Sequence, residues 1–555
     1  MLLSKFAIIC SNLFLIGGAA LATLASLRSR SFIVCFKILQ IGRLDLDFSF
    51  LVDWITLVFS RVLCIIVSCV LKFSKVYMER DIFQVRFTWL VLRFVVSMFC
   101  LIYIPHFFFL LIGWDGLGIT SFLLVIYYLS DSSWAAGMKT FLINRIGDSF
   151  FILCLVLFLR KGYWEIKTAR ENDLLAFLIV LGCFTKSAQF PFSRWLPAAM
   201  AAPTPVSALV HSSTLVTAGI YVMIRFCHML PPRAFLLIGI RGMWTLYSAS
   251  LAACCEYDAK KIVAYSTLRQ LGLMRVAISL KLPMIAFFHL ITHAMFKALI
   301  FICVGYLINK RGHFQDLRRL KGLWSTSPVL AKTLIVRRLS LMGFPFLAGF
   351  FSKELILENK ILIINWVFHA LLLLSLPLTS YYRCRLCFKI LNGANYKRFT
   401  CQKDGNVNFM SILPLYLGSI FSGTILSQYV YRRRSIFPCH TMKFFVTGFI
   451  IRGVLLRWYD IKVKNNSLIY FFSSICFLVP FKRSFWVKKM VNWGRDSFYL
   501  LDQGILRKRI FDIDLRRIKI RETLHNIFGY FLSPQAKYYM MTTRSMRVFV
   551  GLTVV

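Results

Sequence analysis

Acidic residues are scarce in this sequence. Asp and Glu number 23 among 555 residues, and charged residues of both signs make up only 16% of the chain. Soluble globular domains carry roughly 25% charged and roughly 45–50% apolar residues, whereas hydrophobic residues here reach 58%. The shortage of charge excludes an ordinary soluble domain and indicates that lipid is the main solvent of the chain.

The sequence also lacks the motifs that hold redox cofactors. No glycine-rich phosphate-binding loop introduces a soluble α/β unit, and no cysteine cluster has the spacing of an iron–sulfur ligand set. The 16 cysteines lie mostly inside apolar runs, as small packing residues do, so a disulfide framework is not expected. The lone Cys384-x-x-Cys387 has no second pair or nearby histidines, and we interpret it as packing rather than a metal site.

What the sequence does contain is long apolar runs, separated by short polar links along almost the whole chain. Because a helix needs about 20 mainly apolar residues to cross a bilayer, we predict an all-α polytopic membrane protein with about 14–16 transmembrane helices. The clearest candidate spans are residues 6–24, 50–71, 89–104, 107–129, 141–159, 174–192, 206–226, 235–255, 285–308, 329–351, 361–376 and 410–426. The first resembles a secretory signal peptide as well, but the many further spans make a transmembrane helix a sufficient explanation.

Three parts follow one another along the chain. Residues 1–85 are expected to form N-terminal transmembrane helices with few ionisable groups. Residues 86–380 form a dense core, in which Pro and Gly lie inside apolar segments beside Lys, His, Asp and Glu. Residues 381–555 alternate basic stretches with weaker spans and indicate an extension for attachment. Within it, residues 505–521 have an apolar spacing closer to two than to 3.6, and their secondary structure stays open.

Basic residues are in large excess, with 67 Lys and Arg and a formal net charge of +44. In a soluble protein this excess would suggest nucleic-acid binding, but here the basic residues are spread among membrane spans. Each arginine inside an apolar run costs about 2.5–3.5 kcal/mol on insertion scales. The arginines that interrupt such runs are Arg61, Arg93, Arg269, Arg275 and Arg337.

Carboxylates inside the core spans are candidate functional groups, because ionisable residues within a membrane usually mark ion pathways or proton relays. Asp115 lies in the glycine-rich segment 113–118, where a neighbouring helix or water can approach closely. The alternative is a loop aspartate that caps a helix. Arg145 and Asp148 are three residues apart and hence on one helical face, where a structural ion pair and a conducting role are both compatible with the spacing.

Lys186 precedes Pro191 by five residues, and this proline is expected to break the helix. Broken membrane helices line ion sites in transporters. Burial destabilises a lysine ammonium and a nearby carboxylate stabilises it, so a change at the carboxylate would decide whether Lys186 keeps its proton. His211 follows a cluster of prolines and is flanked by hydroxyl residues. Histidine suits a proton relay, although a lone histidine is commonly a hydrogen-bonded core residue.

A polar stripe is expected on one apolar helix. His289, His293 and Lys297 stand at i, i+4 and i+8 and therefore share one helical face. Zinc binding by the two histidines is disfavoured, because the His-Glu-x-x-His form is missing. Lys353 and Glu354 close a further span that contains helix-breaking glycine and proline. Two interrupted spans with a lysine each are typical of transporters built from internal repeats.

Through residues 113–118, 144–148, 185–191, 202–214, 258–272, 289–297 and 343–354, the chain resembles the antiporter-like membrane subunits of respiratory complex I, and in detail the mitochondrial chain 5 family. The resemblance implies two inverted five-helix repeats with broken helices, each forming half a proton channel, joined by a hydrated axis of lysine, histidine and acidic residues. The family's key positions are matched by Asp115, Lys186, His211, Lys297 and Lys353, although many relatives carry glutamate at position 115. It also implies a lateral helix at about residues 485–535 and then a final span.

The resemblance further implies a function. The chain is expected to be a core subunit of NADH:ubiquinone oxidoreductase, a translocase that moves protons across the mitochondrial inner membrane while other subunits pass electrons from NADH to ubiquinone. NADH, FMN, iron–sulfur clusters and ubiquinone would then bind in partner subunits and no cofactor in this chain. Its partners would be neighbouring antiporter-like subunits and the bilayer. A stand-alone cation/proton antiporter of the same fold and a scaffold without transport are the rival interpretations.

The same resemblance bears on the arginines. Mitochondria of invertebrates commonly read two arginine codons as serine, and the family tends to carry serine near position 269. We therefore hypothesise that part of the positive charge comes from reading those codons with the standard code. The excess of basic residues that flanks membrane spans explains instead a run of three arginines, Arg432, Arg433 and Arg434.

Overall fold

The computed structural model describes residues 2–27, 31–41, 44–79, 81–161, 173–345, 347–361, 366–391, 409–433, 440–458 and 492–493. The chain divides into two compact units, Met1–Leu478 and Val479–Val555, and nearly all described residues belong to the first. Apart from residues 492–493, the predicted lateral helix lies outside the described residues, as do the final span and residues 505–521.

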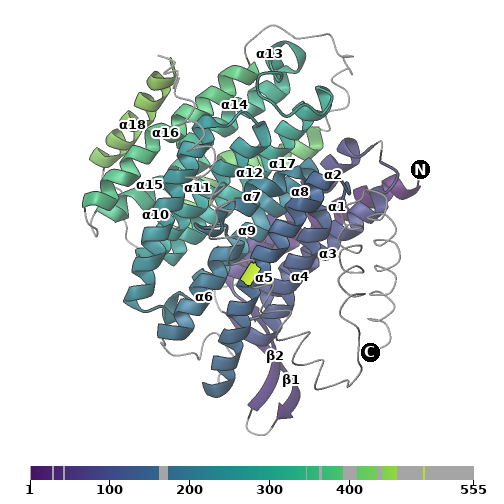
Figure 1. The fold of residues 1–555 in the computed structure, drawn as a ribbon, viewed down its shortest axis with the longest axis vertical. Helices are drawn as coiled ribbons and strands as arrows, with labels where there is room; N and C mark the ends of the chain where they lie inside the picture. Colours follow the sequence, from purple (N-terminus) through teal and green to yellow (C-terminus); the bar gives the residue numbers. More distant parts are fainter. Residues whose placement is uncertain are drawn as a thin grey trace. The chain divides into compact units, whose positions relative to one another are not determined.

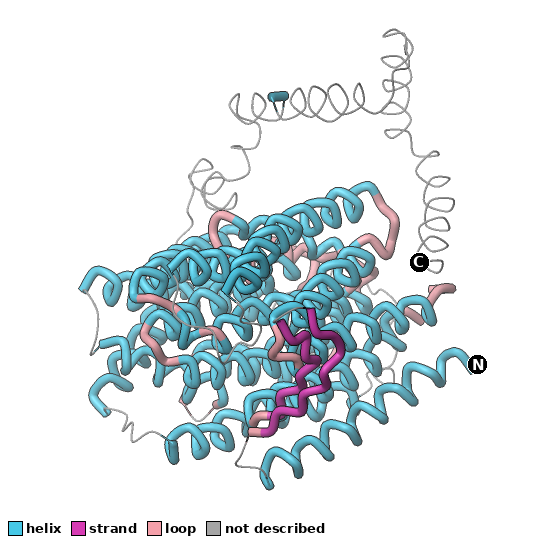
Figure 2. The backbone as a smooth tube through the Cα atoms, turned by 90° about the horizontal axis from the view of Figure 1, so that it is seen from below, coloured by secondary structure: helices cyan, strands magenta, loops and turns pink. Residues whose placement is uncertain are grey.

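The N-terminal part holds a β-hairpin as well as helices (Figures 1 and 2). Helix α1 (Leu2–Leu27) is followed by strands β1 (Phe32–Ile41) and β2 (Leu44–Val52). The strands pair antiparallel with Phe32 opposite Val52, and the register shifts between Lys37 and Leu39. The prediction of an N-terminal part made of helices omitted this hairpin. Its signal is present in residues 44–50, where apolar and polar residues alternate with the period of a strand.

Five long helices come next: α2 (Trp54–Tyr77), α3 (Gln84–Tyr103), α4 (Phe107–Val125), α5 (Asp131–Lys161) and α6 (Asp173–Lys186). Helix α2 begins after Asp53, whose backbone N–H donates to Thr56 Oγ1 at 2.8 Å. This bond satisfies one of the donors that a helix start leaves open. Helices α5 and α6 touch closely, because a Cβ at Gly147 would collide with the side chain of Thr185.

The chain between residues 187 and 230 is broken into short pieces. These are η1 (Phe192–Arg194), α7 (Trp195–Ala198), η2 (Ala199–Ala201), α8 (Thr204–Leu209), the π turn η3 (Val210–Thr214), α9 (Leu215–Arg225) and η4 (Cys227–Met229). Helix α6 stops at Lys186, and Ala188 then takes a left-handed conformation with φ of 52°. The predicted break between Lys186 and Pro191 is therefore present, and span 174–192 is not one continuous helix.

The remaining helices are α10 (Pro232–Cys255), α11 (Ala259–Ser279), α12 (Pro283–Lys310), α13 (Leu323–Thr326), α14 (Pro328–Met342), α15 (Ala348–Ile361), α16 (Trp366–Leu391), α17 (Phe409–Arg433) and α18 (His440–Trp458). Proline opens α10, α12 and α14, where its missing N–H costs nothing. Gly343, with φ of 87°, ends α14. The predicted span 329–351 is thus also interrupted.

Helix α12 lies in the middle of the first unit and packs against α2, α8, α11, α15 and α17 (Figure 1). Among the described residues, seven segments are long and apolar enough to cross a membrane: Trp54–Tyr77, Gln84–Tyr103, Phe107–Val125, Asp131–Leu159, Thr204–Arg225, Pro232–Cys255 and Pro283–Lys310. The first unit is therefore a polytopic helical membrane protein. Other helices, such as α11, are long enough but contain more charged residues.

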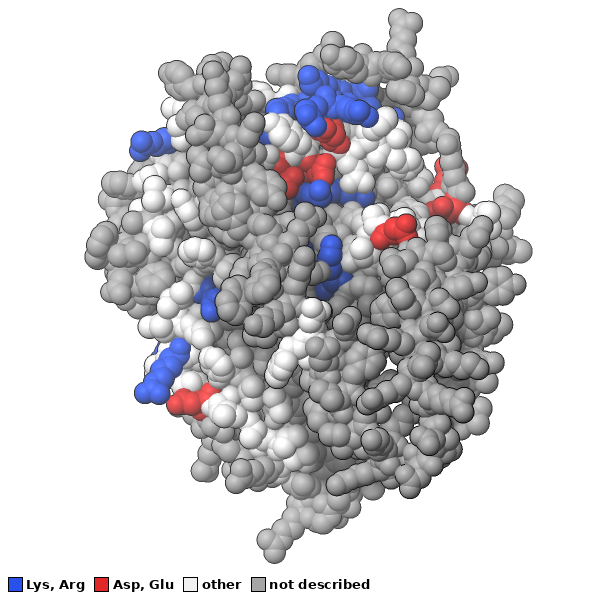
Figure 3. Space-filling view, viewed as in Figure 1, with Lys and Arg blue, Asp and Glu red and all other residues white. Residues whose placement is uncertain are grey.

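The segment before α11 pairs with the loop after α12. Asp258, before α11, forms an antiparallel bridge with Asp316 in the loop after α12. Ion pairs join Lys261 to Asp258 at 2.6 Å and Arg318 to Asp316 at 2.7 Å. On the face drawn in Figure 3, basic and acidic side chains lie together in a mixed group near the top. This mixture of signs suits a polar membrane border.

Candidate functional site

The first group of candidate residues surrounds Lys186 at the broken end of α6. Lys186 is completely buried, and its Nζ donates to the backbone carbonyl of Trp114 and lies 3.9 Å from the centroid of that indole ring. The Trp114 Nε1–H donates in turn to Asp148 Oδ1 at 2.9 Å. Trp114 therefore joins the lysine of α6 to the carboxylate of α5. Sequence reasoning missed this tryptophan, although it directly precedes Asp115.

Arg145 lies between two carboxylates. Its Nη1 is 3.5 Å from Asp148 Oδ2 and 4.0 Å from Asp115 Oδ2. Asp148 is buried, but the side chains of Asp115 and Arg145 are 41% and 45% exposed. The expectation that Asp115 lies buried within the core is wrong, because 41% of its side chain is exposed in this chain. We call Asp115, Arg145, Asp148, Trp114 and Lys186 the Lys186 cluster.

His211 lies in the π turn between α8 and α9. Its ring is buried, and within the described part of the chain neither ring nitrogen has a hydrogen-bond partner. The ring meets that of Trp195 edge to face, with 6.1 Å between centroids. The π turn packs against both α11 and α12. His211 therefore lies beside the helix that carries the second group of candidates, and π turns are frequent at functional sites.

The second group is the predicted stripe on α12. His289, His293 and Lys297 are all completely buried, and the two imidazole centroids are 6.3 Å apart. Lys297 Nζ donates to Ser266 Oγ at 2.5 Å and to the Val263 carbonyl at 3.2 Å, both on α11. The structure thus brings the three residues together on one face, as their spacing predicted.

His289 connects this stripe to α11 and α15. Its Nδ1 is 2.9 Å from Ser352 Oγ, and its Nε2 is 3.3 Å from Gln270 Oε1. Both ring nitrogens have protein partners, which leaves neither free for a metal ion. Ser352 directly precedes Lys353 and Glu354, which are buried in α15. We call His289, His293 and Lys297, together with Ser352, Lys353 and Glu354, the α12 stripe group.

Lys260 is a buried lysine that the sequence reasoning did not single out. Its Nζ donates to the Ala202 carbonyl at 3.1 Å, just before the proline that opens α8. The only sequence signal is a pair of lysines, Lys260 and Lys261, close after Asp258. Only the packing of α11 on the broken segment shows that Lys260 points inward while Lys261 pairs with Asp258.

Three buried arginines have guanidinium nitrogens without hydrogen-bond partners among the described residues. Arg269, Arg275 and Arg337 are completely buried, and each has two guanidinium nitrogens without a partner in the described part of the chain. None of the three forms an ion pair there. Arg225, by contrast, pairs with Asp53 at 3.0 Å. Each donates at least one hydrogen bond, and the Arg275 guanidinium lies 4.2 Å from the Phe184 ring centroid. Buried charges normally have a charged partner, and among the described residues these three have none.

The chain is similar in sequence to known families and proteins over most of its length. Residues 105–379 match the family model described as NADH:quinone oxidoreductase/Mrp antiporter, TM, and residues 38–88 match that of NADH-Ubiquinone oxidoreductase (complex I), chain 5 N-terminus. NADH-ubiquinone oxidoreductase chain 5 of the earthworm Lumbricus terrestris is 40% identical over 497 residues, 85% of each chain. That of the mussel Mytilus edulis is 42% identical over 394 residues, 69% of each chain.

Solved structures show the same fold. A chain of the Mrp complex from Dietzia sp. DQ12-45-1b superposes with a TM-score of 0.75 at 23% identity, over 95% of this chain and 59% of that one. This chain therefore spans little more than half the length of its Mrp counterpart. A chain of the archaeal membrane-bound sulfane sulfur reductase superposes with a TM-score of 0.68 at 19% identity, over 81% of this chain and 92% of that one.

The helical membrane fold, its interrupted helices and its buried lysines and histidines define an antiporter-like membrane subunit, and the predicted fold class is confirmed. The 40% sequence identity with the earthworm protein, over 85% of each chain, narrows this class to one family. The chain belongs to the family of NADH-ubiquinone oxidoreductase chain 5.

Proposed function

We propose that this chain carries protons across the mitochondrial inner membrane as a multi-pass subunit of NADH:ubiquinone oxidoreductase, while other subunits transfer electrons from NADH to ubiquinone. The observation that carries this proposal is a set of buried ionisable residues on interrupted helices, including His211 and His293, whose ring nitrogens have no protein partner in the described part of the chain. A buried imidazole needs hydrogen-bond partners, and water supplies them. Water beside a histidine is a path for protons.

The Lys186 cluster supplies a switch in the first half of the path. Arg145 lies within 4.0 Å of both Asp115 and Asp148 and cannot pair fully with both. When it moves toward Asp115, the Asp148 carboxylate is left to stabilise the ammonium of Lys186, which Trp114 holds nearby. When it pairs with Asp148, that stabilisation falls and Lys186 releases its proton more readily. The exchange needs only a small movement of one flexible side chain.

The α12 stripe group continues the path in the second half. A proton can pass between Lys297, His293 and His289 along one face of α12, since the residues are one helical turn apart. Ser352 bonds His289 and lies next to Lys353 on α15, so it links the stripe to the second lysine. We assign the catalytic path to Asp115, Arg145, Asp148, Lys186, His211, His289, His293, Lys297, Lys353 and Glu354.

The cofactors of the reaction belong, on this proposal, to other subunits. NADH, FMN, iron–sulfur clusters and ubiquinone would be held outside this chain, and its neighbours would be further antiporter-like subunits. Asp115 and Arg145 reach the surface of this chain, where a neighbouring subunit or lipid headgroups can meet them. The chain is thus one part of a proton-translocating enzyme.

The test uses the intact complex in sealed vesicles, with protons moved per NADH oxidised as the measurement. Lys186→Ala and Lys353→Ala should each lower that ratio, because loss of a positioned proton carrier slows proton transfer by about 10²-fold or more. Lys332→Ala is the matched control, since Lys332 is exposed on α14. An unchanged ratio in both variants would show a scaffold. Proton movement driven by a cation gradient without NADH would show a stand-alone antiporter, the fold of which this chain shares.

A further inference from the structure

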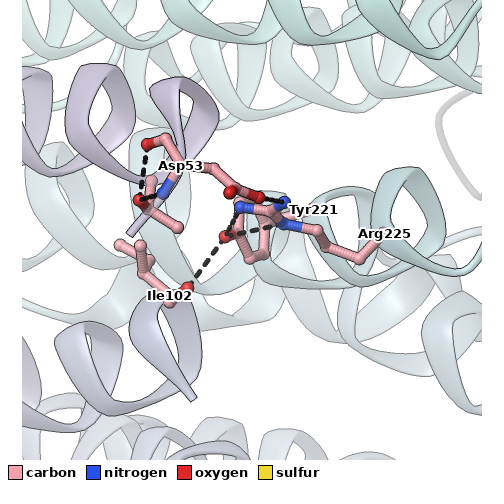
Figure 4. Close-up of polar contacts among 5 residues, drawn as sticks. Asp53, Ile102, Tyr221 and Arg225 are labelled. Atoms are coloured by element: carbon pink, nitrogen blue, oxygen red, sulfur yellow. Dashed lines mark hydrogen bonds and ion pairs between the residues drawn. The ribbon is translucent and has the colours of Figure 1, made fainter. Parts of the chain in front are cut away.

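A mostly buried polar network joins the start of α2, the end of α3 and the end of α9 (Figure 4). Arg225, the last residue of α9, forms an ion pair with Asp53 Oδ2 at 3.0 Å, just before α2 begins. Both side chains are mostly buried, with 13% and 18% exposed. The Asp53 carboxylate lies at the N-terminus of α2 and the Arg225 guanidinium at the C-terminus of α9, so each charge complements the dipole of its helix.

Tyr221 is the centre of this network. Its hydroxyl accepts hydrogen bonds from Arg225 Nε at 3.1 Å and Nη2 at 3.0 Å, and donates to the Ile102 carbonyl at 2.9 Å. Ile102 is in the last turn of α3, where carbonyls lack helical partners. The Tyr221 ring also stacks on Phe59 of α2 with 5.3 Å between centroids. We call Asp53, Tyr221 and Arg225 the α9 anchor.

The anchor fixes a short rigid helix whose other end is the π turn. Helix α9 has 11 residues, which makes it about 16 Å long. It begins at Leu215, whose N–H bonds the Val210 carbonyl across the π turn. Rotation of α9 about its axis would therefore move His211, and the anchor is the contact that opposes this rotation from the far end.

Helix α9 also touches the helix that ends in Lys186. At Gly219 the two backbones are so close that a Cβ would lie 2.7 Å from the Cys183 carbonyl oxygen on α6. With no side chain between them, any turn of α9 presses directly on the last turn of α6. The close contact with α6 therefore resists rotation of α9 near its middle, as the anchor does at its end.

We propose that Asp53, Tyr221 and Arg225 are positioning residues for proton transfer, which hold α9 at the rotation that places His211 in the path. This inference rests on the proposed function of His211. The three residues touch no proton themselves, and they act through the helix that they hold. Arg225 uses three of its N–H groups on two partners, unlike the buried arginines with unpartnered nitrogens.

The first experiment measures protons moved per NADH and the NADH oxidation rate in vesicles that contain the intact complex. Arg225→Gln should leave NADH oxidation in place and slow proton transfer by up to about 10²-fold, the cost of a misplacement of about 1 Å. Arg225→Lys, which keeps the charge, should recover part of the yield. Arg318→Gln, which breaks an exposed ion pair in a loop, should leave the yield unchanged.

Tyr221→Phe keeps the ring on Phe59 and removes only the hydroxyl, so it decides the question even if Arg225→Gln prevents assembly. A normal proton yield with Tyr221→Phe would overturn the proposal. Slower NADH oxidation with an unchanged number of protons per NADH in every anchor variant would show a purely structural role and overturn it as well.

The second experiment combines substitutions. In a His211→Gln background, Arg225→Gln should cause no further loss of proton yield, because the anchor acts through His211. If His211→Gln alone pumps normally, the proposed role of His211 fails. If His211→Gln is impaired and Arg225→Gln multiplies the loss, the role of His211 stands and the positioning proposal fails.

Discussion

Lys186 rests against the face of Trp114, with its Nζ 3.9 Å from the indole centroid. A cation over an indole face is stabilised by about 2 kcal/mol or more when it is desolvated. The same indole donates a hydrogen bond to Asp148 at 2.9 Å. The Trp114 side chain therefore contacts both the Lys186 ammonium and the Asp148 carboxylate.

Trp114→Phe separates these two roles, because phenylalanine keeps an aromatic face for Lys186 and loses the N–H donor to Asp148. A buried acceptor that loses its partner costs about 1–3 kcal/mol. We expect a lower yield of protons per NADH and faster thermal inactivation of the complex. Trp244→Phe is the matched control, since Trp244 is 50% exposed on α10. Equal behaviour of the two variants would contradict a bridging role for Trp114.

Gly147→Ala should weaken the contact between α5 and α6, because the added methyl group collides with Thr185. Overpacking of this kind costs about 1–3 kcal/mol, and it moves Asp148 away from Lys186. Thermal inactivation of the assembled complex, together with the proton yield, measures the effect. Gly118→Ala should be tolerated, since a methyl group added there would have no other atom within 4 Å. The prediction is wrong if the two alanine variants are equally stable.

Ser352→Ala should leave His289 Nδ1 without its partner at 2.9 Å. The expected cost is about 1–3 kcal/mol in stability, with a slower passage of protons between α12 and α15. Protons moved per NADH are again the measurement. Ser149→Ala serves as the control, because Ser149 is exposed and bonds only the Ile146 carbonyl of its own helix. A normal proton yield with Ser352→Ala would exclude this serine from the path.

Peptide masses of the purified chain test the arginine hypothesis. Because Arg269, Arg275 and Arg337 are buried with unpartnered nitrogens, we expect serine at these positions in the protein made by mitochondria. Trypsin should then fail to cut after positions 269 and 275, and it should still cut after Arg225, which has an ion-pair partner. Tryptic peptides that end at position 269 in arginine would refute the hypothesis, and so would CGN codons there.

The loop after α12 should respond to acid. Hydrogen bonds from Arg318 lower the pKa of Asp316 below its ordinary value of 3.8. A carboxyl whose pKa is lower in the folded state stabilises the fold above its unfolded pKa, and this contribution is lost as the pH falls through the folded value. Amide exchange in residues 311–322 should therefore accelerate below about pH 3.8. Asp316→Asn should exchange faster already at neutral pH, and the acid response should disappear.

The predicted helices and their breaks follow from local chemistry. Apolar runs of sufficient length predict membrane helices, and Pro191 and Gly343 predict the interruptions that the structure shows. The spacing of His289, His293 and Lys297 determines that they share a face of α12, because helical geometry is set by the backbone alone. The β-hairpin at residues 32–52 lies between the predicted spans 6–24 and 50–71, and its period-two pattern was not interpreted.

By itself the sequence determined the membrane class, the family and most of the ionisable residues that lie in the core spans. Only the tertiary structure decided which of them meet: Trp114 and Lys186 are 72 residues apart, His289 and Ser352 are 63 apart, and Asp53 and Arg225 are 172 apart. Contacts at such separations depend on how helices pack and rotate against one another, which no local pattern encodes. For the same reason Asp115, central in its apolar run, proved half exposed, while Lys260 beside a loop proved buried.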